Sequence, residues 1–200
     1  MRWPWRKAHL VFLDESGFQL SPVVRRTYAP RGRTPIPEAW HRKGRISAIS
    51  AVTVSPARRR PNLYFRLLPD NANAHGEDTI GFPAQLRGRI KGPMTILWDQ
   101  SKIHGRSGVA KAYLARRPEI VTEDLPGYAP DADPDEGAWG WTRYHRLPNY
   151  APEDAQELRS RLWDELSVLR NRPNLLASFI RRAEIPIPLE LTSRSPRWTQ

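Results

Sequence analysis

Two short hydrophobic runs are distinctive along this chain because each is unbroken and each is followed at once by an acidic residue. Residues 10–13 (LVFL) precede Asp14, and residues 95–98 (TILW) precede Asp99. A continuous run of this length, rather than an alternating one, is typical of a strand that is buried on both faces of a sheet. We therefore predict two central strands that each end on a carboxylate.

The segments around these runs predict a hairpin followed by strands that are joined by helices. Residues 44–55 alternate between apolar and polar positions, and residues 62–68 follow after a basic turn, which indicates an antiparallel hairpin. Further along, we expect helices at 78–90 and 107–117 and a strand at 119–125. This order of elements predicts a mixed sheet.

The last third of the chain predicts a loop and then a helix. Residues 126–141 (PGYAPDADPDEGAWGW) cannot be regular before Pro134, because proline, glycine and aspartate dominate them. After this loop, Pro152 beside two acidic residues indicates the first turn of a helix. We expect a frayed tail from residue 193. The helix should bury an apolar stripe that has helical spacing, formed by Leu158, Leu162, Leu166 and Leu169.

The two acids at strand ends predict a metal site. Neighbouring strands lie about 4.8 Å apart, so Asp14 and Asp99 would emerge together at the edge where α/β sheets gather their active sites. Carboxylates held this close repel each other and need a cation, and oxygen ligands of this kind favour Mg²⁺ or Mn²⁺. An aspartate at a strand end can also be a turn residue or a helix cap. Its recurrence on two matched runs in a strongly basic protein favours the metal site.

A third acidic ligand is expected from the cluster at residues 131–136. The spacing of its three aspartates matches the first ligands of an EF-hand calcium loop. That interpretation fails, because Glu136 stands where the loop requires glycine and Thr142 stands where it requires a bidentate glutamate. The cluster remains either the source of the third ligand or a solvated loop.

The position of a proline decides which acid of this cluster faces the sheet. Pro134 disfavours helical geometry for Asp133, so a helix begins at the proline with Asp133 as its N-cap. Glu136 and Trp139 then lie on roughly the same face, whereas Asp135 is rotated from Glu136 by about 100°. If Trp139 packs inward, we expect Glu136 at the sheet edge and Asp135 in solvent.

Composition narrows the class of protein. The chain has 200 residues and no cysteine, which suits one domain and excludes disulfide frameworks and thiolate metal sites. No apolar run reaches the roughly 20 residues that span a bilayer, and the first residues lack the apolar core of a signal peptide. We therefore expect a soluble protein of the cytoplasm that makes no contact with a membrane.

The net charge of +11 is concentrated in the first half of the chain. Residues 1–60 hold 13 Lys or Arg and 3 Asp or Glu, a net charge of +10, whereas residues 121–150 hold 2 and 6, a net charge of −4. A basic surface attracts polyanions, and the release of counterions makes nucleic acid the expected partner. A basic coat that only confers solubility would have the same composition. The sequence has no metalloprotease helix motif, phosphate loop or nucleophilic-serine elbow.

Four blocks of the sequence resemble a known family. FLDESGF, RRTYAPRGRTP, ILWDQSKIH and YAPDADPDEGAW are similar to successive blocks of the DDE-type catalytic domain of insertion-sequence transposases in the mariner superfamily. The last block is the most specific, since it is similar to the family pattern Y-x-P-x-x-N-P-x-E-x-x-W. The resemblance extends from about His9 to about Pro188.

This resemblance implies an α/β fold of the RNase H-like type, a mixed five-stranded sheet flanked by helices. The catalytic domain would occupy residues 9–188, between a short extension (1–8) and a tail (189–200). The implied activity is the cutting of DNA and its joining to a target by phosphoryl transfer with two Mg²⁺ or Mn²⁺ ions. The implied triad of catalytic and metal-binding residues is Asp14, Asp99 and Glu136.

Three features depart from the family pattern. Asp133 stands where the family usually has asparagine, Gln100 stands where asparagine often follows the second acid, and only eight residues precede the first strand, where a helix-turn-helix region is usual. We expect that region to be encoded separately and the protein to act as a homodimer on DNA. An RNase H-like nuclease without strand transfer and a non-catalytic, transposon-derived DNA-binding remnant remain the alternatives.

Basic residues near these blocks are expected to contact DNA. Lys102, His104 and Arg106 closely follow the second acid, so they are placed to meet a phosphate near the metals. Tyr28 and Trp40 are candidates for stacking on bases. The other basic candidates lie in the first half of the chain: Arg25, Arg26, Arg31, Arg33, Arg42, Lys43 and Arg45, with the run 58–60.

Overall fold

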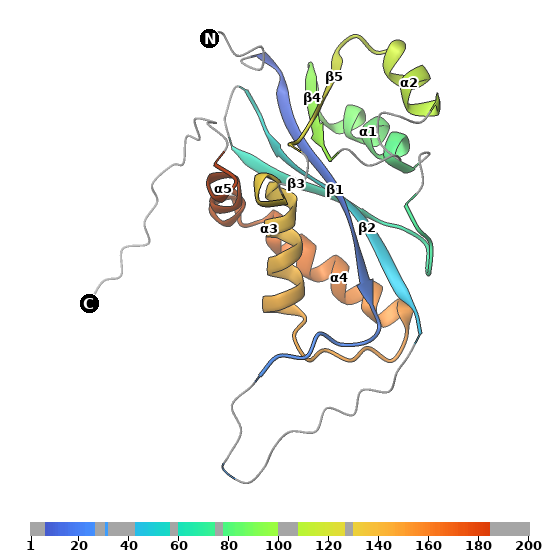
Figure 1. Cartoon of the computed structure of the whole chain (residues 1–200), viewed down its shortest axis with the longest axis vertical. Coiled ribbons are helices and arrows are strands. Elements are labelled where there is room, and N and C mark those ends of the chain that lie inside the picture. Colours follow the sequence, from blue (N-terminus) through green and yellow to red (C-terminus); the bar gives the residue numbers. More distant parts are fainter. Residues whose placement is uncertain are drawn as a thin grey trace, which may run out of the picture.

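The computed structural model of the chain has a five-stranded mixed sheet with helices on both faces (Figure 1). It describes residues 7–26, 31, 43–56, 60–74, 78–99, 108–126 and 130–184. The strands are β1 (His9–Gln19), β2 (Arg45–Val54), β3 (Pro61–Leu67), β4 (Met94–Trp98) and β5 (Ile120–Asp124). The main helices are α1 (Asp78–Arg89), α2 (Gly108–Ala115), α3 (Pro134–Trp141), α4 (Ala155–Arg170) and α5 (Pro173–Arg182).

The order of strands across the sheet is β3-β2-β1-β4-β5. β2 and β3 form the expected antiparallel hairpin, and β1 pairs with β2 in antiparallel fashion. β4 is parallel to both β1 and β5, and the chain between these strands passes through helices. The predicted mixed sheet is therefore confirmed, with the two continuous apolar runs as its central neighbours.

β1 is longer than the hydrophobic pattern predicts. The expected strand ends on Asp14, but β1 continues to Gln19, so that prediction was wrong. The parallel pairing with β4 does stop early, at Phe12 opposite Leu97. The antiparallel pairing with β2 runs on to Gln19, and it holds the polar half of β1 in the sheet by backbone hydrogen bonds that require no apolar side chain.

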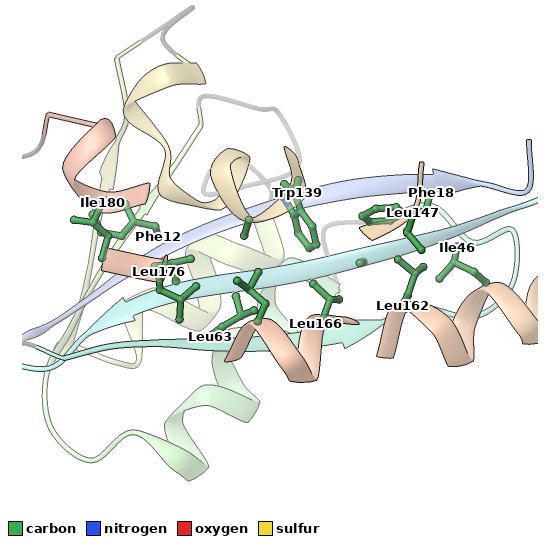
Figure 2. Packing of buried hydrophobic residues seen from close by; sticks show 14 of the residues in the cluster. Phe12, Phe18, Ile46, Leu63, Trp139, Leu147, Leu162, Leu166, Leu176 and Ile180 are labelled. Carbon is green, nitrogen blue, oxygen red and sulfur yellow. The ribbon is translucent and has the colours of Figure 1, made fainter. Parts of the chain in front are cut away.

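Each face of the sheet carries its own hydrophobic core. α3, α4 and α5 cover one face, where Figure 2 shows Trp139, Leu162, Leu166, Leu176 and Ile180 packed over the strands. The predicted leucine stripe of α4 is buried along its whole length, which confirms its place in the core. α1 and α2 cover the opposite face.

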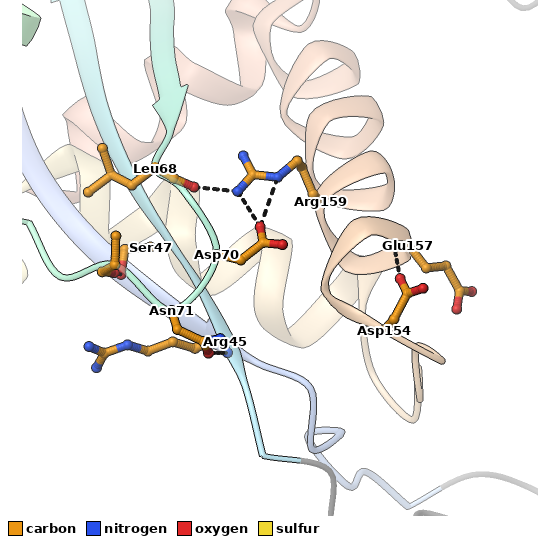
Figure 3. Close-up of polar contacts among 9 residues, drawn as sticks. Arg45, Ser47, Leu68, Asp70, Asn71, Asp154, Glu157 and Arg159 are labelled. Atoms are coloured by element: carbon orange, nitrogen blue, oxygen red, sulfur yellow. Dashed lines mark hydrogen bonds and ion pairs between the residues drawn. The ribbon is translucent and has the colours of Figure 1, made fainter.

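α4 begins later than expected. Pro152 precedes the helix rather than standing in its first turn, because the side chain of Asp154 caps the helix by accepting a hydrogen bond from the backbone N–H of Glu157 at 2.8 Å (Figure 3). The Arg159 guanidinium then pairs with Asp70 at 2.6 Å and ties α4 to the loop after β3.

Some predictions fall on residues for which no structure is described. These include the stacking candidates Tyr28 and Trp40 and the tail from residue 193. Across the described helices, no helix has the length and apolar character needed to cross a membrane.

Candidate active site

Asp14 lies on the face of β1 that packs against α3. Phe12 and Phe18 are an even number of positions from Asp14, so they point to the same face of the strand, and both belong to the core on that face. Asp14 is half-buried, and its partner on β2 is Ser50, which is completely buried. A carboxyl group is therefore placed beside a hydrophobic core rather than in a solvated turn.

Asp99 follows β4 directly, as predicted. The pairing of β1 with β4 ends at Phe12 opposite Leu97, two residues before Asp14 on β1 and two residues before Asp99, which lies just beyond the end of β4. Leu97 packs on the α3 face, so alternation places Asp99 on that face too. That the two acids meet stays a prediction, and Asp99 is the more exposed of the pair.

α3 presents the acids of the third block. It begins at Pro134, and the side chain of Asp133 caps it by accepting a hydrogen bond from the backbone N–H of Asp135 at 2.8 Å. The predicted start of this helix is confirmed. Proline suits the first helical position because its nitrogen has no hydrogen to leave unpaired there.

The inward face of α3 differs from the predicted one. Asp135 is completely buried, and its carboxylate accepts hydrogen bonds from the Ser50 hydroxyl and from the backbone N–H of Val52, the latter at 2.9 Å. The prediction that Asp135 faces solvent was wrong. In a helix, Trp139 lies about 40° from the residue four positions earlier and about 60° from the residue three positions earlier, so Asp135 shares the tryptophan face more closely than Glu136 does.

Trp139 connects the core to the site. Its ring is 1% exposed and meets Phe18 edge-on, with 5.8 Å between ring centroids. Its indole N–H donates a hydrogen bond to the Asp14 carboxylate at 3.0 Å. The condition that Trp139 packs inward is met, but no sequence signal indicated this hydrogen bond, because it joins residues 125 positions apart.

Glu136 lies on the solvent side of the first turn of α3, close enough to act on the other acids. Burial, together with the negative charges of Asp133, Glu15 and Glu136, raises the pKa of Asp14 to about 8. Burial likewise raises the pKa of Asp133, and with the charges of Glu136 and Asp99 included it reaches about 7. These charge interactions link Asp14, Asp133, Glu136 and Asp99 in one acidic cluster, in which Asp99 is connected through Asp133.

The donor set of this cluster fits a divalent cation. All of its ligating atoms are carboxylate oxygens, which suit Mg²⁺ and Mn²⁺, and a bound cation would remove the repulsion that raises these pKa values. In the described part of the chain, no three acidic or histidine side chains are already gathered in the arrangement of a metal site.

A basic residue that contacts β1 two and three residues beyond Asp14 was missed by sequence reasoning. Arg143 belongs to a π-helical turn, η3 (Thr142–Arg146), that continues α3. Its guanidinium donates hydrogen bonds to the Ser16 hydroxyl at 2.7 Å and to the Gly17 carbonyl at 3.1 Å, and it stacks over Phe18. A short π-helical segment often marks a functional site, but its position is not visible in the sequence.

The predicted DNA contacts are only partly described. Arg25 stacks on the exposed ring of Tyr144, with 5.2 Å from the guanidinium carbon to the ring centroid. Arg45 begins β2, and Lys43 precedes it. The structure also describes Arg26 and Arg31. Outside the described residues lie Arg33, Arg42, Arg58, Arg59, Lys102, His104 and Arg106.

Comparison with known proteins agrees with this fold. The Mos1 strand transfer complex aligns at a TM-score of 0.63 with 14% identity, over 92% of this chain and 54% of that chain. The Mos1 mariner paired end complex with Mn aligns at 0.62 with 13% identity, over 88% and 53%. The catalytic domain of Mos1 mariner transposase aligns at 0.56 with 12% identity, over 88% and 78%.

These likenesses confirm the predicted RNase H-like architecture, and at such low identity they show the fold alone. The chain spans about half the length of the Mos1 chains in the two complexes. No curated protein sequence matches it significantly. The family described as DDE superfamily endonuclease matches residues 9–159, which is more than half of the chain. The chain therefore belongs to the DDE superfamily endonuclease family.

Proposed function

We propose that this chain cuts DNA and joins the cut strand to a target, with Asp14, Asp99 and Glu136 as its catalytic carboxylates. The observation that carries the proposal is the strand register, in which Phe12 pairs with Leu97 on the face covered by α3, two residues before Asp14 and two residues before Asp99. Family membership and the likeness to a strand transfer complex support the same reaction class.

The three carboxylates have different surroundings, which suits different tasks. The Trp139 indole holds Asp14 in one orientation at the border of the core. Asp99 and Glu136 are exposed, on the end of β4 and on the first turn of α3, where they face incoming DNA. When bound between these residues, two divalent ions would activate the attacking oxygen and stabilise the leaving oxygen of an in-line displacement.

DNA is the proposed substrate and partner. Among the described arginines, the exposed Arg25 and the half-buried Arg143 would hold phosphates of the backbone and so help to set the position of the reacting phosphodiester. We further propose that the protein acts as a homodimer on DNA.

The test is cleavage of a nicked or pre-cleaved duplex with Mg²⁺ or Mn²⁺, which bypasses end recognition. Asp14→Asn, Asp99→Asn and Glu136→Gln should each reduce the rate at least about 100-fold, because each removes a charge that acts in the transition state. Asp131→Asn is the matched control, since it neutralises an exposed acid in the same block. Equal activity of the triad variants and the control would reject the proposal.

The products decide between the two enzymatic readings. A transposase yields joined molecules in which a 3′ end is linked to a second duplex, whereas a simple nuclease yields only shortened strands. Metal-dependent shortening without any joined product would favour the RNase H-like nuclease. The absence of both products with a folded wild-type chain would favour the non-catalytic alternative.

A further inference from the structure

A cavity of about 500 Å³ lies at the end of the sheet where β1 begins, away from the acids. The end of β2, the start of β3 and the junction between α4 and α5 form its other walls. Its polar lining includes His9, Arg60, Asn62, Arg170 and Asn171. The proposed active site uses none of these residues.

The charged side chains that line this cavity are all positive. Arg60 and Arg170 supply two guanidinium groups, and among the described residues that line the cavity none is acidic. Arg170 lies over the ring of Phe65, with 5.7 Å from its guanidinium carbon to the ring centroid, which holds the group in place. Burial lowers the pKa of His9, so its imidazole serves at neutral pH as an uncharged hydrogen-bonding group.

Neutral polar groups complete the lining. Asn62 is oriented by its own side-chain oxygen, which accepts a hydrogen bond from the backbone N–H of Leu63 at 2.9 Å. α5 begins at Pro173, which also lines the cavity, so the positive end of a ten-residue helix dipole opens towards it. Two guanidinium groups, side-chain amides and a helix start together form a receptor for an oxyanion.

The cavity is separated from the acids along β1. Asp14 is five positions beyond His9, which corresponds to about 17 Å in an extended strand. On β2, Thr53 lines the cavity opposite Val11, whereas Ser50 lies opposite Asp14. A ligand in the cavity therefore occupies a second site on the same sheet.

We propose that this cavity binds a phosphate group of the DNA backbone, at a point remote from the phosphodiester that reacts. The choice of DNA as the source of the phosphate rests on the proposed function. Free phosphate has the same binding chemistry, and an acidic peptide is a competing occupant, so the experiment must separate the three.

The test compares wild type with an Arg60→Gln, Arg170→Gln double variant. Anisotropy of a labelled duplex, measured across a range of salt concentrations, should show that the slope of log K against log [salt] becomes shallower by about 0.9 for one lost phosphate contact. Arg181→Gln, which removes an exposed arginine on α5 outside the cavity, should leave the slope unchanged. Thermal melting of each variant confirms that it is folded.

Two further arms identify the ligand. Titration of inorganic phosphate, followed by amide NMR, should shift the signals of His9 and Asn171 in wild type and not in the double variant. Such shifts with an unchanged DNA slope would overturn the assignment to DNA. Polyglutamate that competes with the duplex in wild type but not in the double variant would point to an acidic peptide and also overturn it.

The outcome is independent of catalysis. A shallower slope in the double variant supports the cavity proposal even if the wild-type chain cuts no DNA, in which case only the proposed function fails. An unchanged slope and an absence of phosphate shifts, in a chain that does cut DNA, would overturn the cavity proposal and leave the proposed function in place.

Discussion

The buried carboxylate of Asp135 should be the main polar anchor between α3 and the sheet. Its side chain is 0% exposed and accepts hydrogen bonds from the Ser50 hydroxyl and the Val52 backbone N–H. Replacing Asp135 by alanine leaves both buried donors without this acceptor, and each unpaired donor costs about 1–3 kcal/mol of stability. Relief of the repulsion from Asp133 and Asp14, which together with burial raises the pKa of Asp135, offsets part of this loss. We expect Asp135→Ala to lower the free energy of unfolding by about 2–4 kcal/mol.

Asp135→Asn separates hydrogen bonding from charge. The amide oxygen can still accept from the Val52 N–H, and the Ser50 hydroxyl can rotate to accept from the amide NH₂ group. Because the variant also removes a carboxylate whose ionisation is opposed by burial, its stability should be within about 1 kcal/mol of wild type, or above it at alkaline pH. Ser50→Ala, which removes one donor and keeps the other, should cost about 1 kcal/mol.

Urea denaturation followed by tryptophan fluorescence measures these differences, with Asp131→Ala as the control for an exposed acid of the same segment. The control should stay within about 0.5 kcal/mol of wild type. If Asp135→Ala were as stable as the control, the carboxylate would not anchor α3. If Asp135→Asn lost as much stability as Asp135→Ala, the negative charge itself, rather than the pair of hydrogen bonds, would be the source of the effect.

Three further predictions follow from other parts of the fold. Gly137→Ala in α3 should destabilise the chain, because the new methyl group would lie 2.7 Å from a ring carbon of Phe179 in α5. Gly140→Ala, also in α3, meets nothing within 4 Å and should raise the free energy of unfolding by up to about 1 kcal/mol in urea denaturation. Glu165→Gln should cost about 1–3 kcal/mol in the same assay, because this buried carboxylate pairs with two arginines. Burial and the neighbouring negative charges raise the pKa of Asp14 to about 8, so between about pH 4 and pH 8 the folded, metal-free chain binds more protons than the unfolded chain. Its free energy of unfolding should therefore fall as the pH rises through this range, and Mn²⁺ should oppose the fall. A free energy of unfolding that rises with pH in the presence of a chelator would contradict this prediction.

The strands and the leucine stripe of α4 could be predicted from the sequence because buried positions are occupied by apolar residues. The unbroken runs before Asp14 and Asp99 are the central strands, and the start of α3 follows from Pro134 alone. The far half of β1 was missed, since backbone pairing with β2 holds it in the sheet and polar side chains give no sign of that.

The interior of the site was harder to predict than its outline. A buried aspartate looks identical in sequence to a solvated one, and only its partners on β2 distinguish Asp135 from Asp131. Similarly, the contact between Trp139 and Asp14 depends on how α3 lies across the sheet, which no local pattern encodes. The assignment of Asp14, Asp99 and Glu136 as metal ligands stays a prediction.

Trp139 makes the geometry of the site depend on the packing of the core. One edge of its ring meets Phe18 within the core, and its N–H group holds the Asp14 carboxylate. The backbone position of Asp14 is set by strand pairing, but the orientation of its side chain is set by Trp139 on α3, the helix that also carries Glu136. A shift of α3 on the sheet therefore moves two of the three carboxylates together and leaves Asp99 behind. For this reason, substitutions that loosen α3 without touching any acid should reduce cleavage more than their cost in stability would suggest.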